Sequence, residues 1–518
     1  MRDNPAKEND RHLRVDQLGV DLKQRAVRSG VVVLAGQAAA GFIGITAVAF
    51  LARLLGPADF GLIAMAFPAV VIASTLRNFG LDIGAIYRER LNSQLMSALF
   101  WLALGLNFLL TLALAAMAPG LAWFYSEPRL VKIMLVFAGA VLVLNLGAQH
   151  ETLLKRQMRF DILALNAVIA AGVGAGVAIA LAFAGAGYWA LVAQTSVIFF
   201  LRSVLAWVKC GWRPAPLQRV DAEYGLVLRA MLVSGRNLTG TRVLTLFSNY
   251  FDRITVGWLA GPAILGLYEN GRRLAFFALD TLYFTLLDVA VAGFSRTAGD
   301  NAQYRVAAIK AVQMTLAVML PCLAFLLVEM RPATLLVLGD RWLPAVPYAQ
   351  LLILAAFAQS LSRTLVWFYL SRDETERQVR WMTIQTTVIL AAVAIGAWLG
   401  GPHGVALGLV CATWGLTIPA IVYGLQNSPF TAMDFAFAAA RPVLLSLGVA
   451  ASLFVIETAK HWSWSPLTHC AVATLIYSLT YVGGWVALPG GSTSGIQMIR
   501  LLCGALGKRP GLNAGQVV

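Results

Sequence analysis

Long apolar runs alternate with short polar connections along most of the chain. Each run is about 20 residues long, which is the length an α-helix needs to cross the hydrocarbon core of a bilayer. The runs are continuous, without the alternation of a transmembrane β-strand, so a barrel is excluded. We therefore predict an all-α, polytopic membrane protein with about fourteen transmembrane helices, at 30–53, 60–83, 95–117, 130–150, 162–184, 187–208, 234–258, 264–290, 306–329, 345–370, 381–399, 403–424, 436–456 and 467–488.

Composition supports a membrane protein and excludes several other classes. Of the 518 residues, 59% are hydrophobic and 13% are charged, whereas a soluble protein carries roughly a quarter charged residues. The basic and aromatic residues do not form a nucleic-acid-binding pattern, so no nucleic acid partner is expected. The five cysteines form no CxxC pair, and the five histidines have no metal-binding spacing. The sequence therefore predicts no metal, no cofactor and no catalytic residue.

The net charge of +15 comes from Lys and Arg that gather in the N-terminal segment and in alternate loops. Such clusters are typical of cytoplasmic loops. They predict that both termini are cytoplasmic, with a leader at 1–29 and a tail at 491–518. The intervening loops, which are poor in Lys and Arg, then face outward, and several of them contain the pair Gly-Pro, which ends a helix and reverses the chain.

A short motif occurs twice, about two hundred residues apart. Residues 54–62 and 259–267 both read Leu-x-Gly-Pro-Ala-x-x-Gly-Leu. Weaker matches follow in the same order, between 122–138 and 335–356 and between 185–194 and 401–410. Three matches in register predict a duplication. Six spans separate the two starts, so the repeats are expected to be parallel and to face each other across a central cleft. The predicted lobes are 30–210 and 225–425, followed by two additional helices within 426–490.

Several charged residues lie inside predicted spans, where each costs about 2.5–3.5 kcal/mol on insertion scales. Helical spacing places those of the second, seventh and eighth spans on polar stripes, which we expect to face the cleft. Arginine binds phosphate bidentately and keeps its charge. We therefore predict an anion site formed by Arg77, Arg242, Arg253, Arg272, Arg273 and Arg363. The residues predicted to position these arginines or to couple an ion are Asp82, Asn249, Asp252, Glu269 and Asp280.

The sequence supports a ligand-binding role more strongly for some of these residues than for others. Asp252 and Arg253 are adjacent, so a structural ion pair is an equally good interpretation of both residues. Arg272 and Arg273 lie about 14 Å into the eighth span at 1.5 Å per residue. One neighbouring carboxylate does not satisfy two arginines at that depth, which favours a ligand.

The chain resembles the Wzx-type polysaccharide transporter family of the multidrug/oligosaccharidyl-lipid/polysaccharide (MOP) flippase superfamily. The resemblance covers most of 30–425 and rests on "LARLLGPADFGLIAMAF" (51–67), 78–107, "LLKRQMRF" (153–160), "GAGYWALVAQ" (185–194), "GWRP" (211–214) and "NYFDRITVGWLAGPAILGLYENGRRLAFF" (249–277). It implies two six-helix lobes, as in MATE transporters, often with two extra C-terminal helices.

The resemblance also implies a function. It is that of a flippase for undecaprenyl-pyrophosphate-linked oligosaccharide repeat units in the bacterial inner membrane, coupled to a Na⁺ or H⁺ gradient. The implied partners are this lipid-linked substrate, membrane lipid, a polysaccharide polymerase and a chain-length regulator. Carried onto this chain, the family pattern points to Arg273, Asn249 and Asp252, while Glu269 and Arg272 depart from it.

Two other function classes are weighed against the flippase. A cation or drug antiporter of the same superfamily would need carboxylates and aromatics without competing arginines. A membrane-embedded glycan polymerase would need clustered acid–base residues in a sizeable outward loop, and the outward loops are short. No GxxxxGK[ST] motif for ATP binding occurs either. The residues therefore favour a transporter that is not an enzyme.

Overall fold

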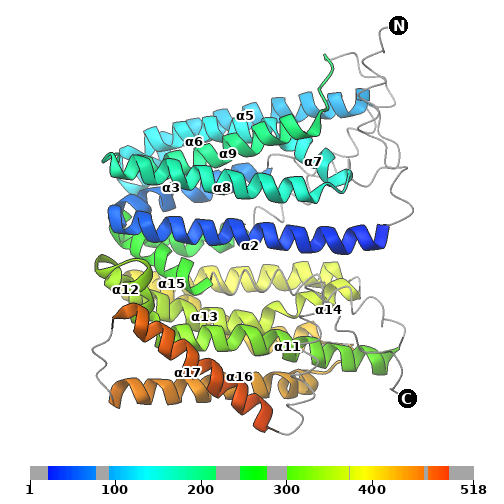
Figure 1. Ribbon diagram of the computed structural model, residues 1–518, viewed down its shortest axis with the longest axis vertical. Coiled ribbons are helices and arrows are strands. Elements are labelled where there is room, and N and C mark those ends of the chain that lie inside the picture. The colour runs from blue at the N-terminus through cyan, green and yellow to red at the C-terminus, as the bar shows by residue number, and fades with distance from the viewer. Residues whose placement is uncertain are drawn as a thin grey trace. The chain divides into compact units, whose positions relative to one another are not determined.

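The computed structural model describes residues 22–76, 93–216, 246–276, 300–372, 374–426, 428–459 and 465–488 (Figure 1). Within these ranges the regular structure is α-helix with one short 3-10 helix, and no strand occurs. The predicted all-α class is confirmed. The chain divides into two compact units, Met1–Asn270 with Thr386–Gly408 and Gly271–Gln385 with Leu409–Val518. The predicted boundaries of the lobes, leader and tail remain predictions.

The first unit contains seven numbered helices. α8 packs against both α2 and α9, and α6 packs against α5, α3 and α9. Pro57 begins α3, where its missing N–H costs nothing, and Gly211 ends α9 in a left-handed conformation (φ 75°). The bounds are α2 Leu22–Leu54, α3 Pro57–Leu76, α5 Ser93–Tyr125, α6 Arg129–Leu146, α7 Ala148–Arg156, α8 Phe160–Phe183 and α9 Trp189–Cys210.

The second unit is built around α11, which packs against α13 and α16. Its first turn is capped by the side chain of Asp300, which accepts hydrogen bonds from the backbone N–H groups of residues 302 and 303. The bounds are α11 Asn301–Val328, α12 Met330–Val337, η2 Asp340–Ala345, α13 Val346–Arg363, α14 Val366–Ser371, α15 Thr375–Gly424, α16 Ala432–Ala459 and α17 Pro466–Ala487. The middle of α15, residues 386–408, belongs to the first unit.

The described residues contain eleven helices long and apolar enough to cross a membrane. One of these, α15, holds two of the predicted spans, because Gly400 and Gly401 break it with non-helical backbone angles. The helical stretch 246–276 is likewise interrupted at Gly261, whose φ is 74°. Gly401 (φ 56°) and Gly261 have positive φ angles, which glycine adopts readily, so the residue type explains both breaks. The count of fourteen itself remains a prediction.

Small residues bring the helices of the first unit close together. A Cβ on Gly396 would overlap the carbonyl oxygen of Gly404, and a Cβ on Gly36 would meet Ala164 of α8. Several large apolar side chains are instead exposed at the surface of the unit, such as Phe183 (72% exposed) and Trp398 (86% exposed). Small residues inside and large apolar residues outside are the arrangement expected of helices whose solvent is lipid.

Candidate functional site

Four of the predicted site residues, Arg77, Asp82, Arg242 and Asp280, lie outside the described residues. The others are on the stretch 246–276 and at the end of α13. The break at Gly261 folds 246–276 into a hairpin, so that residues before it meet residues after it. The hairpin brings together Asn249, Asp252, Arg253 and Glu269. Tyr250 and Tyr268 also belong to this cluster, through contacts with Arg253 and Asp252.

Arg253 is at the centre of this polar cluster. Only 7% of the residue is exposed. Its guanidinium lies 3.7 Å from a carboxylate oxygen of Asp252 and 3.6 Å from one of Glu269, and it donates a hydrogen bond of 2.7 Å to the backbone carbonyl of Asn249. It also lies 3.8 Å from the centre of the Tyr250 ring, a cation–π distance. Two carboxylates and a ring therefore compensate one buried guanidinium.

Asp252 has a second partner that the sequence did not suggest. The hydroxyl of Tyr268 donates a 2.8 Å hydrogen bond to its other carboxylate oxygen. Tyr250 and Tyr268 are not among the predicted residues, which are charged side chains inside spans together with Asn249. The signal was available, since Tyr250 is one helical turn before Arg253 and Tyr268 adjoins Glu269.

Arg272 and Arg273 follow Glu269 by one helical turn but have different surroundings. Arg272 is half-buried and lies 4.3 Å from the ring centre of Phe276, whereas Arg273 is exposed. Both lie about 17 Å along the helix from the turn at Gly261 at 1.5 Å per residue. Arg363 is half-buried in the last turn of α13, and Asn249 is exposed. Arg273 is thus the most exposed arginine of the stretch 246–276.

The two copies of the repeated motif contact each other in the first unit. A Cβ on Gly61 would overlap the carbonyl oxygen of Pro262, and a Cβ on Gly266 would overlap that of Pro57. Each copy thus places its second glycine on the proline of the other copy. The reciprocal contact requires backbone against backbone, which explains why glycine occupies both positions. Both Gly-Pro turns are on the side that the charge distribution predicts to face outward.

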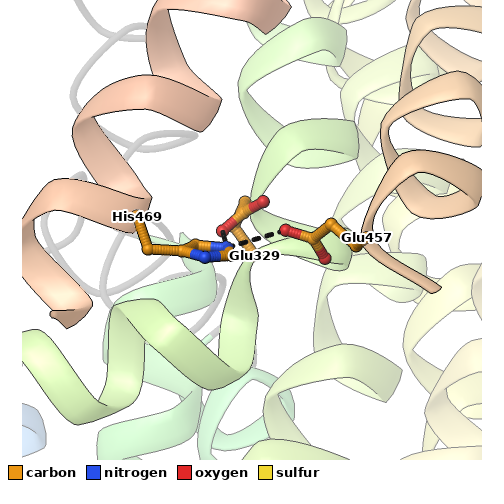
Figure 2. A group of neighbouring side chains, drawn as sticks. All are labelled: Glu329, Glu457 and His469. Carbon is orange, nitrogen blue, oxygen red and sulfur yellow. Dashed lines mark hydrogen bonds and ion pairs between the residues drawn. The ribbon is translucent and has the colours of Figure 1, made fainter. Parts of the chain in front are cut away.

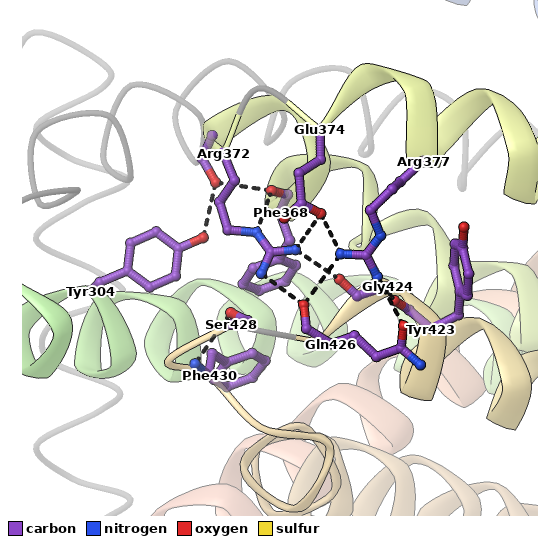
Figure 3. Close-up of polar contacts among 11 residues, drawn as sticks. Tyr304, Phe368, Arg372, Glu374, Arg377, Tyr423, Gly424, Gln426, Ser428 and Phe430 are labelled. Atoms are coloured by element: carbon purple, nitrogen blue, oxygen red, sulfur yellow. Dashed lines mark hydrogen bonds and ion pairs between the residues drawn. The ribbon is translucent and has the colours of Figure 1, made fainter.

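Arginine side chains link the first and last residues of α15, both of which are predicted to be on the cytoplasmic side (Figure 3). Glu374 accepts hydrogen bonds of 2.7 Å from Arg372 and 2.6 Å from Arg377. The same guanidinium groups donate to the carbonyls of Tyr423 and Gln426, which are at or just beyond the end of α15. Cations at a helix C-terminus satisfy its free carbonyls and its dipole. These loop arginines therefore stabilise the end of a helix, in addition to indicating the predicted cytoplasmic side.

We expect Glu374→Gln to destabilise the protein, because two partly buried arginines lose their shared anion. Charged hydrogen bonds of this kind contribute about 1.5–3 kcal/mol each before solvent screening, so the apparent Tm in detergent should fall by several degrees. Glu376→Gln is the matched control, because Glu376 and its partner Arg380 are 89% and 71% exposed and such pairs contribute little. Equal Tm values for the two variants would contradict a structural role of the network.

Comparison with known proteins gives the family. A family model described as "Polysaccharide biosynthesis protein" matches residues 50–347, more than half of the chain. The chain is 21% identical over 369 residues to the lipopolysaccharide biosynthesis protein WzxC of Escherichia coli (strain K12), covering 71% of this chain and 74% of that protein. It is 24% identical over 407 residues to the succinoglycan biosynthesis transport protein ExoT of Rhizobium meliloti (strain 1021), covering 77% and 80%.

The fold also has a counterpart among solved structures. The lipid II flippase MurJ in an inward closed conformation superposes with a TM-score of 0.68 at 13% identity, covering 92% of this chain and all of that one. ExoT is named a transport protein and MurJ a flippase, so these two similar proteins are transporters and not enzymes. The chain therefore belongs to the polysaccharide biosynthesis protein family of multi-pass membrane proteins, as its resemblance to the Wzx-type transporters predicts.

Proposed function

We propose that the protein flips undecaprenyl-pyrophosphate-linked oligosaccharide repeat units across the bacterial inner membrane, by alternating access, for the synthesis of a surface polysaccharide. The family, the relatives WzxC and ExoT and the MurJ-like fold support transport of a lipid-linked saccharide. The observation that carries the choice of an anionic headgroup is the Arg272–Arg273 pair. Both arginines are deep in an apolar helix, and Arg273 is exposed.

We assign the pyrophosphate to the predicted arginines other than Arg253. Arg273 offers its guanidinium fork to the phosphate oxygens, and Arg272 is held beside it by its ring contact with Phe276. Arg77, Arg242 and Arg363 complete the proposed anion site. The two carboxylates around Arg253 support a different role for that residue, which is to hold the hairpin together.

The cycle requires a contact that opens and closes, and the reciprocal Gly–Pro contact is suited to this. It brings two predicted outward turns together through backbone atoms. In the proposed cycle the turns separate to release the sugar outward, while the isoprenoid tail stays in lipid. A Na⁺ or H⁺ gradient drives the change, with no resident cofactor. Asp82, Asn249 and Asp280 are the proposed ion-coupling residues, whereas Asp252 and Glu269 position Arg253. A polymerase and a chain-length regulator are the proposed downstream partners.

We expect Arg273→Ala to abolish most flipping while leaving membrane insertion unchanged, because the phosphate loses a bidentate, permanently charged partner. Loss of a charged hydrogen-bonded contact costs about 1.5–3 kcal/mol, which corresponds to roughly 10- to 150-fold in rate. The assay reconstitutes the purified protein in vesicles and measures outward exposure of a labelled undecaprenyl-pyrophosphate oligosaccharide. Arg273→Lys should recover only part of the loss, because lysine keeps the charge and loses the fork.

Lys310→Ala is the control for simple loss of positive charge, because Lys310 is an exposed residue of α11 outside the proposed anion site. Wild-type protein that exposes no more label than empty vesicles would overturn the proposed function. Normal flipping by Arg273→Ala would remove only Arg273 from the site. Export of cationic dyes by the wild type, without flipping, would favour the antiporter.

A further inference from the structure

Three side chains that the proposed function does not use converge in the second unit (Figure 2). Glu329 joins α11 to α12, Glu457 is near the end of α16, and His469 is in the first turn of α17. One oxygen of each carboxylate and one ring nitrogen of the histidine all lie within 4.8 Å of one another. Three different helix ends therefore direct potential metal ligands to one point.

Glu329 is the residue that requires an explanation. Its exposed fraction is 0%, and in the described part of the chain neither of its carboxylate oxygens has a hydrogen-bond partner. The Nε2 atom of His469 lies 3.2 Å from one of these oxygens. A buried carboxylate without a hydrogen bond is strongly unfavourable, because it has lost its hydration without full compensation.

His469 alone does not compensate two carboxylates. The same Nε2 atom lies 2.8 Å from an oxygen of Glu457. A ring nitrogen carries at most one proton, so it donates to one carboxylate at a time. With both carboxylates ionised, even a protonated imidazole would leave the three groups with a net charge of −1. A divalent cation with two carboxylates and a neutral imidazole gives a net charge of zero.

The geometry suits an ion bound between the three groups. Bonds of about 2.0–2.1 Å in a tetrahedral site put adjacent ligand atoms about 3.3 Å apart. The two separations at Nε2, 2.8 and 3.2 Å, need only small shifts to reach this spacing. Glu457 and His469 also line a small cavity between α16 and α17 whose other walls are apolar.

We propose that Glu329, Glu457 and His469 bind one divalent transition-metal ion, with Zn²⁺ as the best match. One imidazole nitrogen and two carboxylate oxygens form a ligand set that zinc accepts, with one position left open. The ion fastens α16 and α17, which follow the predicted repeats, to the end of α11. Sequence spacing does not reveal the site, because its ligands come from positions 329, 457 and 469 on three separate elements.

The test uses purified full-length protein in detergent, stripped with a chelator, dialysed against Zn²⁺ and analysed for bound metal. We expect one zinc per chain and a Tm that rises by a few degrees when zinc is added, because the ion binds only the folded state. Glu329→Gln keeps the shape of the side chain and should lose both the ion and the Tm shift. Glu127→Gln is the control, because Glu127 pairs with Arg129 away from this cluster.

Co²⁺ provides a second readout, since its visible absorption reports a tetrahedral site with nitrogen and oxygen ligands. The wild type and Glu127→Gln should give this spectrum, and His469→Gln should not. A stripped wild-type protein that takes up no Zn²⁺ at tenfold excess would overturn the proposal, whatever the variants do. Equal zinc uptake by the wild type and a folded Glu329→Gln, judged by gel filtration, would also overturn it. Neither result depends on the flipping assay.

Discussion

A Gly61→Val variant is expected to insert into the membrane normally and to flip lipid-linked oligosaccharide at no more than about a fifth of the wild-type rate. The reason is steric, because a side chain at this position would overlap the backbone of Pro262. Overpacking of this kind costs about 1–3 kcal/mol, so the closed Gly–Pro contact would be populated roughly 5- to 150-fold less. A cycle that must pass through this contact then slows in proportion. Flipping in reconstituted vesicles and polysaccharide export in cells both measure the effect.

The repeat supplies its own replicate of this experiment. In Gly266→Val, the new side chain would overlap the backbone of Pro57, which belongs to the other copy of the motif. This variant should reduce flipping to the same degree. Gly105→Val and Gly172→Val are the controls, because a Cβ at either position meets no atom within 4 Å although both glycines lie in helices of the same unit. If Gly61→Val and Gly266→Val flip at the wild-type rate, the Gly–Pro contact has no part in transport.

The same contact shows what can and cannot be inferred from the sequence alone. The repeated motif, its glycines and the break at Gly261 could all be read from the residues, because helix termination and left-handed glycine are local effects. The reciprocal packing of Gly61 on Pro262 and Gly266 on Pro57 could not be read, because it depends on how distant segments meet. The all-α class was equally local, since continuous apolar runs allow few other structures in lipid.

The candidate site was predicted less completely than the fold. Helical spacing identified Asp252, Arg253 and Glu269 as polar residues inside spans, and the structure brings them into one cluster. Spacing along one helix does not show whether a charge faces a ligand or another charge. The burial of Arg253 and the exposure of Arg273 could be learned only from the fold. The Glu329–Glu457–His469 group was missed altogether, because its members belong to three different helix ends.

The exchange Arg253→Met is expected to have the largest effect on stability of any single substitution in the hairpin. It leaves the carboxylates of Asp252 and Glu269 without the cation that they share, and Asp252 is only 5% exposed. Removing one partner of a buried ion pair costs about 3–5 kcal/mol, because the remaining charge is uncompensated. We expect little folded protein in the membrane fraction and a strongly lowered Tm for the protein that is recovered.

A triple variant, Asp252→Asn with Arg253→Met and Glu269→Gln, separates the two interpretations of Arg253. Replacing a whole buried ion cluster by neutral residues of similar shape is often close to neutral for stability, and the amide oxygen introduced by Asp252→Asn would still accept the hydrogen bond from Tyr268. If Arg253 only holds the hairpin together, the triple variant recovers folded protein together with most of the flipping. If Arg253 binds the pyrophosphate, the triple variant folds but does not flip. We expect the first result, since in the described residues the Arg253 guanidinium is buried and contacts both carboxylates.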